Sequence, residues 1–103
     1  ISLNIGTSGK AHIEYSAFMI PTVLGAAGRN FGLLFLDVSG ATTATNTYWN
    51  ASLANETAWT TQSFGNSILV TGLNPGINNF KLRYGAVSAT MAFSNRQISG
   101  YAI

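Results

Sequence analysis

Alternation of apolar and polar residues is the clearest signal in this chain of 103 residues. Over residues 10–19 the alternation is strict, with Ile13 and Tyr15 on one side and His12 and Glu14 on the other. Successive side chains of a strand point to opposite faces of its sheet, so this period of two predicts a half-buried strand. The pattern therefore indicates a β-strand over residues 10–19.

Similar runs, separated by turn residues, recur along the chain. We expect further strands at residues 1–5, 31–38, 68–70, 79–84, 89–93 and 98–103. Pro21 and Gly85 are expected to end strands, because proline cannot donate to a ladder and glycine weakens one. A bend is expected at residues 94–96, and Asn74-Pro75-Gly76 has the composition of a tight turn.

Residues 41–66 are ambiguous. A helix is one option over residues 51–58, where Asn50 would cap a segment containing the helix formers Ala, Leu and Glu. The Thr-rich clusters around that segment favour strands instead. We predict two or three strands here, joined by long connections.

The strand count predicts an all-β fold: one domain, residues 1–103, forming an antiparallel jelly-roll sandwich of about eight strands. Residues 31–38 are apolar at both odd and even positions, whereas a sandwich strand normally has one wet face. We therefore expect one face to pack on another subunit. The sequence does not determine whether the odd- or the even-numbered residues face outward, since a slip of one residue in the strand pairing exchanges the two faces. The interface candidates are Leu34, Leu36, Tyr84 and Tyr101.

Charged residues make up only 8% of the chain and hydrophobic residues 47%. Ordinary soluble domains contain about 25% charged residues. No apolar run approaches the roughly 20 residues of a membrane helix, so we expect no membrane insertion. Packing into an oligomer or a large assembly is the plainest explanation.

The net charge of +2 comes from dispersed residues, and a phosphate-binding surface needs a cluster, so no nucleic acid is expected. The absence of cysteine excludes disulfides and a Cys nucleophile. It fits a reducing cytoplasm, or an extracellular particle made there without oxidative folding. Because the chain starts with Ile1 in a strand-like run, we expect it to be a piece of a longer protein.

Few residues are candidates for chemistry. His12 and Glu14 form a His-x-Glu pair on one strand face, but two ligands leave a metal site incomplete. Acid–base catalysis by a carboxylate pair would have to use Glu14, Asp37 or Glu56, and no Gly-x-Ser-x-Gly elbow is present. We predict no catalytic site, no metal and no cofactor.

Tyr48, Trp49 and Trp59 lie among Asn and Thr residues. Such aromatics stack on sugar rings while amides bind hydroxyls, and they also fill cores and subunit contacts. Both interpretations stay open, and a carbohydrate-binding module is the alternative to a structural role.

Four segments resemble parts of a domain common in bacteriophage structural proteins. They are VTGLNPGINNFKLRY at residues 70–84, ATMAFSNRQI at 89–98, GTSGKA at 6–11 and LDVSGATT at 36–43. The chain departs from that pattern in its ending, SGYAI, and in lacking a Gly-Gly after residue 84.

The resemblance is to minor tail, fibre and head-decoration domains, and it implies the trimeric jelly roll of tumour necrosis factor and the complement C1q head. It further implies a non-enzymatic virion protein, made in the host cytoplasm and exposed on the particle. The expected partners are two further copies of the chain, other virion proteins such as major capsid or tail proteins, and host-surface carbohydrate.

Overall fold

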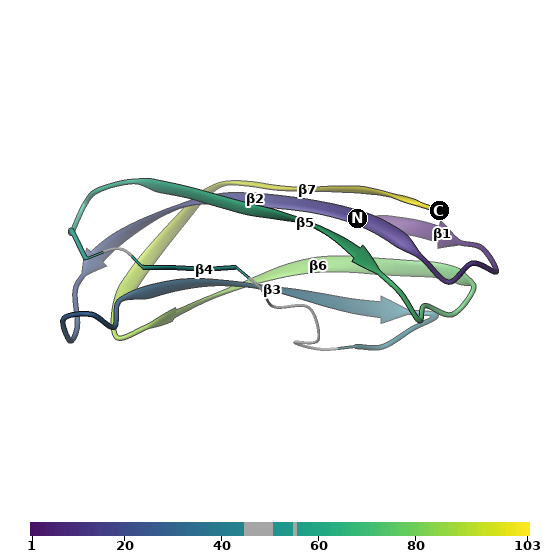
Figure 1. Ribbon diagram of the computed structural model, residues 1–103, viewed down its shortest axis with the longest axis horizontal. Coiled ribbons are helices and arrows are strands. Elements are labelled where there is room, and N and C mark those ends of the chain that lie inside the picture. The colour runs from purple at the N-terminus through teal and green to yellow at the C-terminus, as the bar shows by residue number, and fades with distance from the viewer. Residues whose placement is uncertain (45–50, 55) are drawn as a thin grey trace.

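The protein is an all-β sandwich of two antiparallel sheets. The computed structural model describes residues 1–44, 51–54 (backbone only) and 56–103, and no helix occurs among them. The strands are β1 (Ser2–Ile5), β2 (Ala11–Val23), β3 (Phe31–Gly40), β4 (Ala51–Ala54), β5 (Gln62–Val70), β6 (Gly76–Val87) and β7 (Thr90–Ala102). Sheet A has the order β1-β6-β3-β4, and sheet B the order β5-β2-β7 (Figure 1). The predicted all-β, antiparallel architecture is confirmed.

Consecutive strands mostly lie in different sheets; among the described strands, only β3 and β4 are consecutive in the chain and paired within one sheet. The strands follow the long axis of the molecule, whose extents are 47 × 20 × 16 Å (Figure 1). Within the described part of the chain, no helix is long and apolar enough to cross a membrane.

The core fills the space between the two sheets. Sheet B contributes the odd-numbered residues of β2, as their alternation predicts, and sheet A contributes the even-numbered residues of β3 and β6. Burial of this apolar area is the main stabilising contribution, at about 25 cal/mol per Å². The fully or nearly fully buried apolar residues include Ile5, Ile13, Tyr15, Met19, Leu34, Leu36, Val38, Val70, Phe80 and Leu82.

Two expected interruptions do not end strands. β6 continues through Gly85, where an added Cβ would lie 3.1 Å from the Phe35 ring, so glycine makes room for that ring. β7 continues through residues 94–96, because Asn95 and Arg96 form a β-bulge opposite Ala17 and Asn95 takes a φ of 48°. One bulged strand thus replaces the two that were predicted.

Pro21 lies inside β2 rather than ending it. The last pair between β2 and β5 is Met19 with Gln62, so at Pro21 only β7 still pairs with β2. On the edge of β2 that no longer pairs with β5, the sheet needs no backbone N–H from Pro21. The Pro21 carbonyl on that edge accepts a hydrogen bond of 2.8 Å from the Trp59 backbone N–H. Proline is tolerated where a strand has become an edge.

The segment 51–58, for which a helix was one option, begins with strand β4 paired to β3. Residues 45–50 and 55 lie outside the described residues. The strand prediction for this region is confirmed at β4 and at the start of β5.

Candidate functional site

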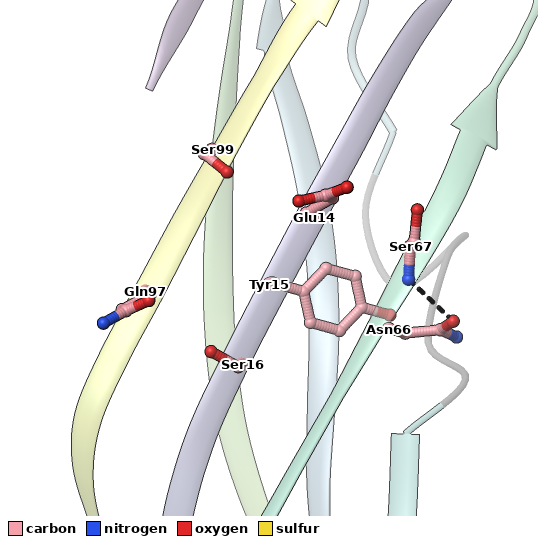
Figure 2. A pocket seen from close by; sticks show the side chains of 7 residues that line it. All are labelled: Glu14, Tyr15, Ser16, Asn66, Ser67, Gln97 and Ser99. Atoms are coloured by element: carbon pink, nitrogen blue, oxygen red, sulfur yellow. Dashed lines mark hydrogen bonds between the residues drawn. The ribbon is translucent and has the colours of Figure 1, made fainter.

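A shallow hollow lies on the outer face of sheet B. Its volume is about 220 Å³, and all three strands of the sheet contribute to it (Figure 2). We call it the sheet B hollow, lined by Glu14, Tyr15, Ser16, Asn66, Ser67, Gln97 and Ser99.

The hollow lies over two cross-strand rows in which most of the outward residues are serine or glycine. One row is Ser67, Glu14 and Ser99, and the next places Ser16 between Gly65 and Gln97. The adjoining row consists of larger residues, Leu69, His12 and Tyr101, and Phe18 follows on the other side. Large side chains standing roughly perpendicular to the sheet thus rise on both sides of small ones.

Hydrogen bonds hold the lining in place. The Ser67 hydroxyl lies 2.7 Å from His12 Nε2, and the Ser67 backbone N–H donates to Asn66 Oδ1 at 2.8 Å. The phenol of Tyr15 points between the sheets; burial raises its pKa, and a hydrogen bond with Asn66 opposes that rise. Within the lining, Ser67 is therefore bonded to His12 and to Asn66, and Asn66 is bonded to the buried Tyr15.

An aromatic pair borders the hollow. The rings of His12 and Tyr101 stack with centroids 5.2 Å apart and planes inclined by 28°. Tyr101 remains 59% exposed, so the pair presents an aromatic surface to solvent beside the hydroxyl, amide and carboxylate groups. The bulge at Asn95 lies next to Gln97, at the other side of the hollow.

The residues weighed for catalysis lie apart. Glu14 is in the hollow, whereas Asp37 is on sheet A in an ion pair with Arg83, and Glu56 is in the connection after β4. Among residues 1–44 and 56–103, no three His, Cys, Asp or Glu side chains gather where a metal ion would bind. His12 and Glu14 do share the outer face of sheet B, and His12 is bonded to Ser67.

A second exposed feature is the end of the sandwich where β2 and β6 finish. Trp59 is 72% exposed, with a φ of 63° that non-glycine residues rarely adopt. Val23 and Leu24 are also exposed there, and Val87 precedes the β6–β7 turn. We call these four residues the Trp59 tip. Of the aromatics proposed for glycan contact, Trp59 is thus on the surface, while Tyr48 and Trp49 lie outside the described residues.

The backbone beneath the tip is organised by Asn30, which is 1% exposed. Its amide oxygen accepts a bond from Gly25 N at 2.7 Å, and its amide N–H groups donate to Ala26 O and to Glu56 Oε2 at 3.0 and 2.7 Å. The bond from the Asn30 side chain, together with one from the Asn30 backbone N–H to Glu56 Oε1 at 3.3 Å, lowers the pKa of Glu56, with a smaller contribution from the Gly28 backbone. Asn30 therefore links the β2–β3 loop to the connection before β5.

The interface candidates do not share a face. Leu34 and Leu36 are 0% exposed in the core, whereas the odd-numbered residues of β3, which include Phe31, Leu33 and Phe35, lie on the outward side. The reason is that sheet A had to cover the odd-numbered side chains of β2, and the even-numbered residues of β3 face them.

Tyr84 also points between the sheets. Its ring centroid lies 5.1 Å from that of Phe93 on β7, and the Arg96 guanidinium lies 5.3 Å above the Tyr84 ring. Tyr101, in contrast, is on the outer face of sheet B, so only this member of the four predicted residues is largely exposed.

Sequence reasoning missed the hydroxyl and amide residues of the hollow, notably Ser67, Gln97 and Ser99. Each is an ordinary polar residue on a strand. The available signal was alternation: 12, 14 and 16 are the outward residues of β2, and an antiparallel partner would bring small polar residues beside them. Which partner, and in what register, was not visible along the chain.

Comparison with family models, with curated proteins and with solved structures finds no match to this chain.

Proposed function

We propose that this chain is a non-enzymatic structural domain of a bacteriophage particle, a capsid-decoration or tail/fibre domain that forms a homotrimer and contacts other virion proteins. The resemblance of four sequence segments supports this assignment, as does the low charge content of 8%. The two-sheet sandwich supports the fold class that the resemblance implies. The jelly roll, the trimer and the location on the virion surface are parts of the proposal.

The observation that carries the proposal is the apolar outer face of sheet A. The outward residues Phe31, Leu33 and Phe35 follow one another along β3, and Val87 is paired with Phe31. On a solvated sheet these positions are normally polar, because alternation separates a core face from a wet face. An apolar face of this kind is typical of an obligate interface.

Polar residues border this face. The Arg83 guanidinium lies 5.4 Å above the Phe35 ring and is paired with Asp37. An apolar centre with a charged rim is the usual anatomy of a protein interface. We propose that the outer face of sheet A makes the contact between copies.

Light scattering coupled to size exclusion tests the proposal. At tens of micromolar we expect a species of three times the chain mass of 10.9 kDa. Leu33→Glu places a charge in the centre of the face and is expected to give a folded monomer. Ser39→Glu, on the same face but beyond the apolar residues, serves as the matched control and should leave the mass unchanged. A wild-type monomer at this concentration would contradict self-association.

A carbohydrate-binding module is the second candidate. Trp59 favours it, because an indole that is 72% exposed at the end of a sandwich is available for stacking on a sugar ring. The apolar sheet A face favours assembly instead.

A further inference from the structure

We propose that the sheet B hollow binds a neutral or amino-substituted saccharide, with Glu14, Ser67, Gln97 and Ser99 as hydrogen-bonding residues and Tyr101 as the stacking surface. This site is on the sheet opposite the proposed self-association face, and the inference does not depend on the trimer. It also differs from the Trp59 tip in both residues and position.

The chemistry of the lining selects the ligand class. Glu14 supplies a carboxylate that accepts hydrogen bonds, Gln97 an amide that donates and accepts, and the serines hydroxyls that do both. A ligand rich in hydroxyl groups is complementary to such a mixture. The described lining contains no Lys or Arg, and the carboxylate would repel a second anion, so phosphates and acidic sugars are disfavoured.

The position of the aromatic pair adds the apolar half of a sugar site. Tyr101 lies one row beyond Glu14 and Ser99, which corresponds to about 7 Å along a strand. That distance is comparable with the width of one pyranose ring. A sugar with polar groups in the hollow can therefore place its C–H face, or that of the next residue, against Tyr101.

The aromatic side of the site is held in place before a ligand arrives. The ring of His12 supports Tyr101 from one side, and Ser67 holds His12 at 2.7 Å. These residues stand on paired strands rather than on a loop, so little conformational entropy is lost on binding. A shallow site of about 220 Å³ fits one or two sugar residues and weak affinity.

Isothermal titration calorimetry on the purified chain tests the site. The probes are cellotriose, maltotriose, mannotriose, galactobiose and the trimer of N-acetylglucosamine, with trigalacturonic acid and sialyllactose as acidic counterparts. We expect at least one neutral or amino-sugar probe to bind with a Kd in the micromolar to millimolar range, and the acidic probes to bind at least tenfold more weakly. Failure of all neutral probes at 10 mM, or preference for the acidic ones, would overturn the proposal.

Variants locate the binding. Glu14→Gln, Gln97→Ala and Tyr101→Leu are each expected to weaken binding tenfold or more, whereas Tyr101→Phe keeps the ring and retains it. Ser99→Tyr fills the hollow from an exposed position and should abolish binding while the circular dichroism spectrum stays unchanged. Trp59→Ala tests the other candidate aromatic site: loss of binding in Trp59→Ala but not in Ser99→Tyr would reject the hollow.

The same samples separate this inference from the proposed assembly. The variants of the hollow should keep the mass of the wild type in light scattering. Leu33→Glu should lose self-association and still bind the saccharide. If the wild type is an oligomer, Ser99→Tyr is a monomer, and neither binds a saccharide, then the outer face of sheet B is a contact between copies and the saccharide site is rejected.

Discussion

The outer faces of the two sheets carry different side chains, although both inner faces contribute apolar residues to one core. On sheet A, the outward residues of β3 include Phe31, Leu33 and Phe35. On sheet B, serines and Gln97 lie beside Glu14 and line a hollow, and larger residues such as Leu69 and Tyr101 stand in the next row. Both β2 and β3 contribute alternate residues to the same core, so packing in the core does not explain the difference between the outer faces. Large apolar side chains suit contact with another protein, and small hydrogen-bonding ones suit a soluble ligand.

The largest expected effect tests which residues of β3 belong to the core. Leu34→Ala removes a side chain with 0% exposure and should lower the free energy of unfolding by about 2–5 kcal/mol. Leu33→Ala, the same substitution one residue earlier on the outward side, should cost about 1 kcal/mol or less. Urea denaturation followed by tryptophan fluorescence at low micromolar concentration measures both. Equal losses would show that the two faces of β3 are not distinguished as described.

A smaller effect concerns the sheet B side of the comparison. Gly65 pairs with Ser16, and a Cβ added to Gly65 would lie 2.5 Å from the Tyr15 carbonyl oxygen. Gly65→Ala should therefore push β5 away from β2 and cost about 1–3 kcal/mol in the same urea experiment. Gly6→Ala is the matched control, because no atom lies within 4 Å of its added Cβ. A stability of Gly65→Ala equal to that of the control would mean that the close approach of β5 to β2 is absent.

The smallest effect is a dependence on pH at the end of the sandwich, away from the sheet B hollow. Hydrogen bonds from Asn30 lower the pKa of Glu56 in the folded chain below its ordinary value of 4.5. The ionised form is thus favoured by folding, so its stabilising contribution is complete above pH 4.5 and is lost as the pH falls through the lower, folded-state pKa.

Thermal melting of the wild type and of Glu56→Gln between pH 3 and pH 7 checks this sign. The wild type should melt at the higher temperature at neutral pH, and the difference should shrink as the pH falls below 4.5. A difference that stays constant over the whole range would show that Glu56 acts through packing rather than through its charge.

Some of the fold was predictable because it depends on neighbours along the chain. The two-residue alternation at residues 10–19 is a local property, and it correctly predicts both β2 and the inward side of β2. The strand ends were less predictable. Taken alone, Pro21 and Gly85 predict strand ends. In the structure, Pro21 lies beyond the last residue of β2 that pairs with β5, and Gly85 lies under the Phe35 ring. In both cases the partner, not the residue, decides whether the strand continues.

The hollow and the composition of the outer faces could not be predicted from the sequence. Ser67, Glu14 and Ser99 are far apart in the sequence and become neighbours only through pairing registers. A register shifted by one residue would bring different side chains together on that face, since the side-chain period is two. The sites were therefore not visible as a motif.

By itself the sequence determined that this protein is all-β and where most strands lie. These properties follow from local alternation, turn residues and composition. Only the tertiary structure decided which of the two apolar faces of β3 became the core, how the bulge at Asn95 joins two runs into β7, and which polar residues surround the hollow. The physical reason is that both sheets must bury their apolar sides against each other, and that packing selects one parity and one register from several that are locally equivalent.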